Sequence, residues 1–151
     1  MKSVLSNYIC RLTIIAIAIL STLANVSCSN NEDNTIEKRA KDFAQNYFNF
    51  RYEAAMNMCT EESKKWIVFH ASNISQDDIN AINSQTDTAS CEVEDIDVNE
   101  IDGIASVKLI VKNAFMADSI GKNGEIASST EKELRMKMIS GIWYVDLNKP
   151  L

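Results

Sequence analysis

The residues of this sequence that could do acid–base chemistry are a single histidine and a few tyrosines and carboxylates. A general base is a histidine or carboxylate with a second polar group within hydrogen-bond reach. One such pocket would form if the fold brought these residues together: Tyr47, Tyr52, His70, Tyr144 and Asp146. However, His70 follows Trp66 and Phe69 on one expected helix, which favours a partly buried structural imidazole. Spacing does not decide between these readings, and we assign no catalytic residue.

The carboxylates offer little support for a metal site. With one histidine and no Cys-x-x-Cys pair, only a run of strand acids could gather around an ion: Glu92, Glu94, Asp95 and Asp97. Alternating acids on an exposed strand are typical of a solvated sheet edge. The four glycines form no phosphate-binding loop. We expect neither a metal nor a cofactor.

The strongest pattern lies at the N-terminus. Lys2 and Arg11 flank a polar start, and residues 12–20 form an apolar run. A membrane-spanning helix needs about 20 apolar residues, so this run is typical of a secretory signal instead. Small residues then lead to a cysteine. We therefore expect residues 1–27 to be a signal peptide.

Val26-Ser27-Cys28 resembles the lipobox of bacterial lipoproteins, although Asn25 stands where that pattern prefers leucine. The resemblance implies cleavage between Ser27 and Cys28 and diacylation of the Cys28 thiol. Two or three acyl chains anchor a protein firmly, because each buried methylene contributes about 0.8 kcal/mol. The membrane is thus an expected partner, through the N-terminal lipid. An ordinary signal cut at a nearby small residue, or an uncleaved anchor, would be the alternative.

Residues 28–34 contain no apolar side chain after the cysteine and are expected to form a flexible tether. Ser29, rather than aspartate, resembles the Gram-negative signal for outer-membrane delivery. Glu32-Asp33 resembles the acidic signal that some lineages use for surface export. We expect a Gram-negative outer-membrane lipoprotein whose domain, residues 35–151, faces the periplasm or the cell surface.

The charge of the chain argues against nucleic acid as a partner. It carries 15 basic and 21 acidic residues. Loss of Lys2 and Arg11 with the signal leaves 13 basic and 21 acidic residues, a net charge of −8. Such a domain is repelled by phosphate backbones, and no basic stripe interrupts its acidity.

Two cysteines remain once Cys10 is removed with the signal and Cys28 is acylated. Cys59 and Cys91 would then lie in an oxidising compartment, where pairs of thiols form disulfides. A bridge between them would close a loop of roughly 30 residues and contribute about 3 kcal/mol. Two separate buried thiols are the other reading, and the sequence leaves both open.

Apolar residues at helical spacing dominate the first half of the domain. They predict a helix over residues 35–50 with Thr35 as its N-cap, followed by a bend near residues 49–51 and a helical segment over 52–59. Thr60 predicts a second N-cap. The spacing of Ser75 and Asp78 is typical of a capping box that opens a short helix.

The second half has the period-two alternation of strands. Cys91 and Val93 share one parity, whereas Ile96 and Val98 share the other, which predicts a β-bulge between the pairs. Asp102-Gly103 predicts a hairpin turn. Further strands are expected over residues 107–115, 133–138 and 142–147. Helices followed by a short-looped meander predict an α+β fold, with N-terminal helices packed on a curved antiparallel sheet of about four strands.

Three features together resemble the nuclear transport factor 2-like cone fold: the long aromatic helix, the helix near residues 52–56, and the closing hairpin at residues 140–146. More narrowly, the chain resembles small bacterial lipoproteins of this fold. The resemblance implies a curved sheet around helices with a cavity at its open end. Members include isomerases, dehydratases and binding modules, so the fold does not decide the function.

We therefore expect a non-catalytic envelope module that binds a small ligand or a protein through the mouth of the cone. The alternatives are a cone-fold enzyme using His70 or Asp146, and a structural or inhibitory interaction protein. Asp87-Thr88-Ala89 and Asp118-Ser119-Ile120 also resemble three-residue O-glycosylation sites of some Gram-negative lineages. Thr88 and Ser119 would be the glycosylated residues.

Overall fold

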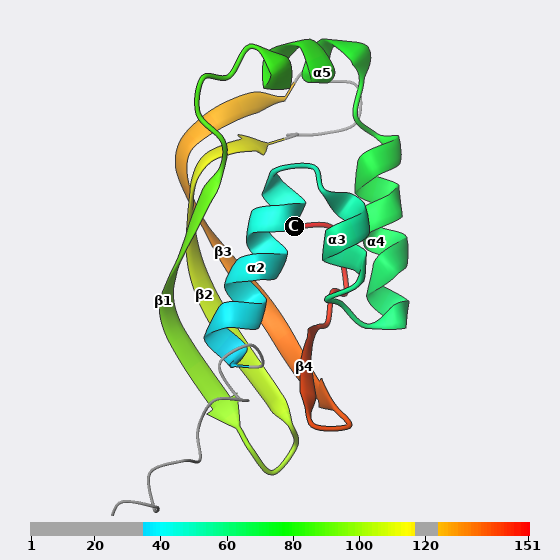
Figure 1. Cartoon of the computed structure of the whole chain (residues 1–151), viewed down its shortest axis with the longest axis vertical. Coiled ribbons are helices and arrows are strands. Elements are labelled where there is room, and N and C mark those ends of the chain that lie inside the picture. Colours follow the sequence, from blue (N-terminus) through cyan, green and yellow to red (C-terminus); the bar gives the residue numbers. More distant parts are fainter. Residues whose placement is uncertain (1–34, 117–123) are drawn as a thin grey trace, which may run out of the picture. The chain divides into compact units, whose positions relative to one another are not determined.

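The computed structural model of this chain describes residues 35–116 and 124–151 (Figure 1). The predictions for Ser27, Cys28, Ser119 and the ranges 1–27 and 28–34 lie outside these residues. The elements follow in this order: α2 (Ile36–Phe48), α3 (Tyr52–Met56), α4 (Glu61–Ser72), α5 (Gln76–Asn83), β1 (Ser90–Asn99), β2 (Ile104–Met116), β3 (Glu125–Ile139) and β4 (Ile142–Val145). The strands form one antiparallel sheet in the order β1-β2-β3-β4. The expected α+β architecture is confirmed.

The helices begin where the capping residues predict. The Thr35 side chain accepts a hydrogen bond from the Lys38 N–H, and the Ser75–Asp78 capping box is complete in both directions. The bend between α2 and α3 falls at Phe50, whose φ is 61°. These starts are predictable because N-capping is a local interaction between residues three apart.

The strands also match the sequence, with one exception. The register of β1 against β2 shifts between Val93 and Asp95, which is the predicted β-bulge. Gly103 has a φ of 61° in the predicted hairpin turn. β3 is longer than expected, because its first half, Glu125 to Thr130, lacks the alternation of buried and exposed side chains that marks a strand.

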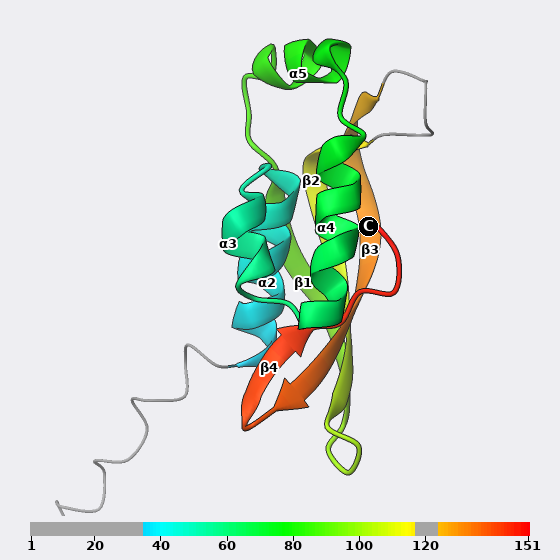
Figure 2. The same cartoon turned by 90° about the vertical axis from the view of Figure 1, so that its right-hand side faces the viewer.

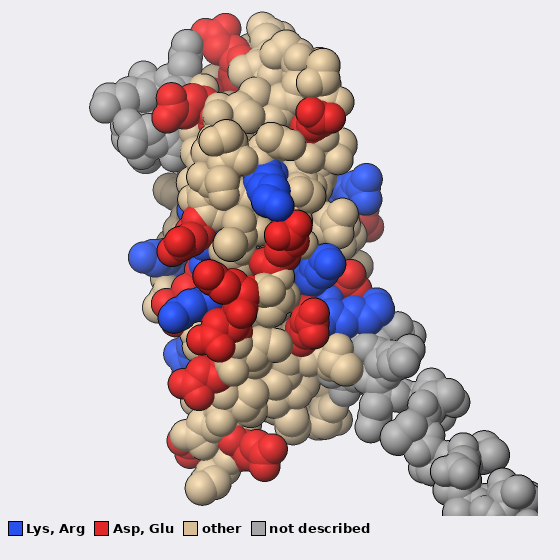
Figure 3. All heavy atoms as spheres, turned by 90° about the vertical axis from the view of Figure 1, so that its left-hand side faces the viewer, with Lys and Arg blue, Asp and Glu red and all other residues tan. Residues whose placement is uncertain are grey.

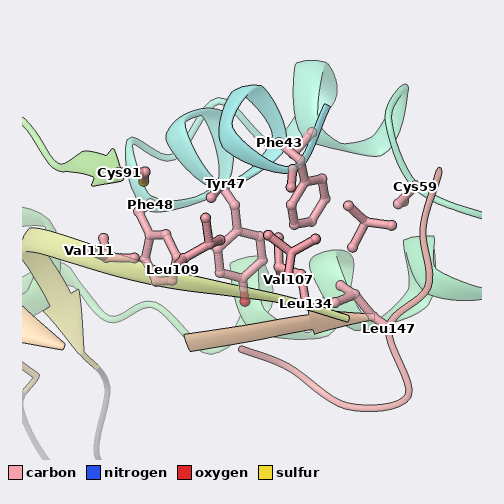
Figure 4. Close-up of a cluster of buried hydrophobic side chains, with 14 of the residues drawn as sticks. Phe43, Tyr47, Phe48, Cys59, Cys91, Val107, Leu109, Val111, Leu134 and Leu147 are labelled. Atoms are coloured by element: carbon pink, nitrogen blue, oxygen red, sulfur yellow. The ribbon is translucent and has the colours of Figure 1, made fainter. Parts of the chain in front are cut away.

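The core lies between the helices and one face of the sheet. Phe43, Tyr47 and Phe48 point from α2 toward Val107 and Val111 of β2 (Figure 4). The helices α2, α3 and α4 all cover this face (Figures 1 and 2). Within the described ranges, no helix combines the length and apolar content needed to span a bilayer.

The helix α5 is fastened across one end of the sheet. The Asp78 carboxylate, which closes the capping box, also accepts a hydrogen bond of 2.9 Å from the Gly124 N–H before β3. Gly124 leaves no room for a side chain, since a Cβ there would lie 2.1 Å from the Phe115 ring. The Asp78 hydrogen bond therefore fixes α5 to the residue before β3, and the Phe115 ring of β2 lies directly against that same residue.

The two cysteines of the domain are separate buried thiols. Cys59 and Cys91 are both free, and they lie toward opposite ends of the core (Figure 4). The disulfide reading is thus not realised, because two thiols that are not adjacent cannot be bridged. Burial raises the pKa of each thiol to about 11. Both are therefore protonated and unreactive at neutral pH.

Two of the acids of β1 form cross-strand ion pairs. Glu92 lies 3.0 Å from Lys112, and Asp95 lies 4.0 Å from Lys108. Figure 3 shows acidic side chains running down this side of the molecule among scattered basic ones. In the part of the chain that the structure describes, no three His, Cys, Asp or Glu side chains cluster for a metal ion.

Candidate functional site

A buried polar junction joins the start of α4 to the end of β4. Ser63 is fully buried, and its hydroxyl accepts a hydrogen bond of 2.7 Å from the Leu147 N–H. The same hydroxyl lies 2.6 Å from that of Thr60 and 3.4 Å from the Val145 carbonyl. The hydroxyl of Thr60 donates to Asp146 at 3.2 Å rather than capping its own helix. Three side chains thus set the direction in which the chain leaves β4.

Beyond β4 the chain stays beside β3 for one residue and then diverges. The Asp146 N–H donates to the Arg135 carbonyl at 2.8 Å, and the Asp146 carboxylate lies 3.6 Å from the Arg135 guanidinium. The backbone N–H of Leu151 donates to the Tyr47 hydroxyl at 3.4 Å, so this segment returns to the core. We call residues 146–151 the C-terminal segment.

A groove of about 450 Å³ lies between β3 and the C-terminal segment. Its β3 side is formed by residues 131–133 and Arg135, with Ser106 of β2 beside them, and its other side by residues 146–151. Carboxylates and cations both line it. The carboxylates are Glu131, Glu133 and Asp146, and the cations are Lys132, Arg135 and Lys149. A groove of this size and mixed charge suits a small polar ligand or a short extended peptide.

The backbone of β3 is open toward this groove. β4 pairs with β3 only from Met136 to Ile139, whereas β2 pairs with β3 from Glu125 to Lys137. Because the Arg135 carbonyl faces the β4 side, the backbone groups two and four residues earlier, at Glu133 and Glu131, face the same side. These N–H and C=O groups point into the groove and can pair with another strand.

Three of the five residues predicted to share a pocket do meet. The His70 ring stacks on the Tyr47 ring at 5.2 Å between centroids and meets the Tyr52 ring edge-on at 5.9 Å. Burial raises the pKa of Tyr47 to about 12 and raises that of Tyr52 as well. The Tyr52 hydroxyl is buried and has no hydrogen-bond partner among the described residues. The three side chains contact one another through their rings, which agrees with the interpretation of His70 as a partly buried structural residue.

One residue of the groove, Lys132, also affects the pKa of His70. Burial lowers the pKa of His70, and the Lys132 ammonium lowers it further. The pKa of Lys132 is itself lowered, first by burial and then by Lys149. Lys132 lines the groove, and its charge is also felt by the His70 imidazole.

Tyr144 and Asp146 lie elsewhere. Asp146 binds Thr60 at the start of α4, whereas His70 is in the last turn of that helix; ten residues of helix rise about 15 Å. The Tyr144 ring contacts the Arg39 guanidinium at 5.2 Å, in the first turn of α2, far from Tyr47 in its last turn. The five residues do not form one pocket, so His70 and Asp146 are not an acid–base pair.

Sequence reasoning missed most of the groove. Lys132, Arg135 and Lys149 have no distinguishing pattern, and Ser63 reads as an ordinary polar helix residue. The only sequence feature near the groove is the polar first half of β3, before its buried and exposed side chains begin to alternate. That feature predicts neither a buried strand nor a turn. Thr88, by contrast, is an exposed loop residue, as a glycan would require, although its glycosylation stays a prediction.

Comparison with known proteins adds a fold-level likeness. No protein-family model matches the sequence, and no curated protein matches it. A crystal structure from Campylobacter jejuni, described as a putative NTF2-like transpeptidase, is similar with 15% identity and a TM-score of 0.43, and the match covers 80% of this chain and 100% of that one. Its description names the fold family that the sequence resembles. A likeness at this level assigns no activity, substrate or partner to this chain.

Substitution of Ser63 by alanine removes a single oxygen atom but should lower the free energy of unfolding of the domain clearly. It leaves the buried Leu147 N–H without an acceptor, which costs about 1–3 kcal/mol in the free energy of unfolding. Urea denaturation measures this. Ser72→Ala is the matched control on the same helix, because its exposed hydroxyl should contribute no more than about 0.5 kcal/mol. Equal losses of unfolding free energy in the two variants would contradict the claim that the buried Ser63 hydroxyl stabilises the contact between α4 and the chain after β4.

The pKa of His70 should lie below the ordinary histidine value of about 6.5. The unfolded chain then binds more protons than the folded one below that pH, so stability falls as the pH drops from about 6.5 toward the folded pKa. As the only histidine, His70 gives one imidazole signal in an NMR titration. His70→Phe should remove this part of the pH dependence. A measured pKa of 6.5 or above would refute the burial of the ring.

Proposed function

We propose that this chain is a lipid-anchored protein of the Gram-negative cell envelope, whose domain binds an extended segment of a partner protein without catalysing a reaction. The observation that supports binding is the groove between β3 and the C-terminal segment, with an open strand edge as one of its sides. The N-terminal pattern ending at Cys28 supports the anchor and the outer-membrane location.

The binding mode we propose is strand addition. An extended peptide lying beside β3 would accept from and donate to the outward backbone groups of Glu131 and Glu133, as a further strand does. Backbone pairing supplies affinity, and the charged side chains around the groove supply the preference for one sequence. Such a site needs no cofactor.

A hydrolase- or isomerase-like role has less support. Catalysis would require a second titratable group within about 3 Å of His70 or Asp146. The contacts of His70 are the rings of Tyr47 and Tyr52, and Asp146 is engaged by Arg135 and Thr60. Each is thus accounted for as a structural residue.

Two substitutions at one position separate backbone pairing from side-chain recognition. Glu131→Pro removes the outward N–H while leaving the bonds from β3 to β2 intact, and proline is tolerated at a strand edge. Glu131→Ser removes the charge but keeps the N–H. We expect Glu131→Pro to weaken retention of the envelope partner at least tenfold, a change of about 1.4 kcal/mol, and Glu131→Ser to weaken it far less.

The measurement is a pull-down from envelope fractions with a soluble chain starting at Asn34, with mass spectrometry of what is retained. Thermal unfolding of both variants serves as the folding control. Equal retention by the proline and serine variants would contradict strand addition. A small molecule retained in place of a protein, with both variants equally impaired, would instead identify a side-chain ligand site.

A further inference from the structure

The exposed apolar residues of the domain are concentrated at one end of the sheet. Of the nine large apolar side chains that the described residues leave exposed, five belong to the strand ends and turns around the two hairpins. Ile101, at the β1–β2 turn, is 97% exposed. The other four are 38% to 43% exposed: Val98, Met138, Ile139 and Ile142. We call these five residues the hairpin patch.

The residues of the hairpin patch surround the adjoining tips of the two hairpins, with Val98 and Met138 on the face of the sheet that carries the core and Ile139 and Ile142 on the other face. Ile139 and Ile142 are direct cross-strand partners in β3 and β4. The Met138 N–H donates to the Gly103 carbonyl at 2.8 Å, which joins the second hairpin to the first beside Ile101. Isolated surface apolar residues need no explanation, but five gathered around one tip of the sheet indicate an end of the domain that meets an apolar environment on both faces.

The start of the folded chain lies at the same end. Arg39, in the first turn of α2, donates to the Trp143 carbonyl at 2.9 Å, one residue from Ile142. Thr35 is only four residues before Arg39, a rise of about 6 Å. Figures 1 and 2 both place the start of α2 beside the two hairpins, with α5 at the opposite end.

We propose that the hairpin patch contacts the lipid bilayer in which Cys28 is anchored. This proposal rests on the lipid anchor of the preceding subsection. Six residues separate Cys28 from Thr35, and the seven residue-to-residue steps between them span at most about 25 Å even in a fully extended chain. The end of the domain that carries Thr35 is therefore held near the membrane, and it is the end that carries the hairpin patch. The covering surface is lipid rather than a second copy of the chain.

The charges around the hairpin patch define the kind of lipid surface. Glu100 and Asp102 flank Ile101, the most exposed residue of the hairpin patch, whereas the basic residues at this end are Lys137 of the adjacent strand and Arg39 of α2, which is bonded to the Trp143 carbonyl. At the tip itself only acids flank Ile101, and these are repelled by an anionic membrane surface. The hairpin patch thus fits a zwitterionic surface, such as phosphatidylcholine or phosphatidylethanolamine, better than a surface rich in phosphatidylglycerol.

The test uses the full lipidated chain, purified in detergent and reconstituted into phosphatidylcholine vesicles. An environment-sensitive fluorophore is attached at Ile101→Cys, an exposed turn position that tolerates substitution. The buried thiols of Cys59 and Cys91 do not compete for the label. Ile79→Cys on α5 is the matched control, since it is also an exposed isoleucine but lies at the opposite end.

We expect the label at residue 101 to shift to the blue and to lose most of its fluorescence when the vesicles contain doxyl-labelled lipid. The label at residue 79 should do neither. Partial replacement of phosphatidylcholine by phosphatidylglycerol should reduce quenching at residue 101.

The other outcomes separate the two proposals. If the chain floats with vesicles while residue 101 is not quenched, the docking proposal is overturned and the anchor stands. If the chain floats no better than its Cys28→Ser variant, the anchor falls and docking falls with it. Equal quenching at residues 79 and 101 would indicate unspecific adsorption. A blue shift at residue 101 without quenching would indicate that a second copy of the chain covers it. Equal quenching at both positions and a blue shift without quenching would each overturn the docking proposal.

Discussion

The course of the C-terminal segment depends on one buried hydroxyl, that of Ser63. It lies where α4, β4 and the C-terminal segment meet, and it accepts the Leu147 N–H that would otherwise be buried without a partner. A buried polar group is tolerated only when its hydrogen bonds are made, so this contact fixes the direction of the chain after Val145. Because the C-terminal segment is one side of the groove, the shape of the site follows from this junction.

Three strands have an edge that is not paired along its whole length with another strand: β1, β4 and the part of β3 that extends beyond β4. The three edges differ in how they are protected from pairing with another chain. The short β4 edge is covered, since its Val145 N–H and C=O bind Met58 and Thr60 and its Trp143 carbonyl binds Arg39. β1 carries acids and a bulge, both of which discourage pairing with another strand. β3 between Glu125 and Leu134 also carries acids, but its register with β2 has no bulge, and no strand among the described residues pairs with its outer side. An edge left open beside a groove, in a domain that protects its other edges, is the physical basis of the proposed binding.

Much of the fold could be predicted from the sequence because its determinants are local. The caps at Thr35 and Ser75, the bulge after Val93 and the turn at Gly103 each depend on residues a few positions apart. The site could not be predicted in the same way. Its residues come together through long-range pairing of β3 with β2 and through the Ser63 junction, and neither leaves a pattern in the sequence. Five residues were named as a pocket on the condition that the fold brought them together. The structure brings His70 to Tyr47 and Tyr52 and places Tyr144 and Asp146 elsewhere, an outcome that spacing does not decide because it does not place one element against another.

The central claim, that β3 accepts a further strand, is tested most directly by residue-resolved amide exchange of the domain before and after capture of its envelope partner. In the free domain, the amides of Glu131 and Glu133 should exchange rapidly, while those of Lys132 and Leu134, which face β2, should exchange slowly. After capture all four should exchange slowly. Slow exchange at residues 131 and 133 in the free domain, or unchanged rapid exchange after capture, would contradict the account.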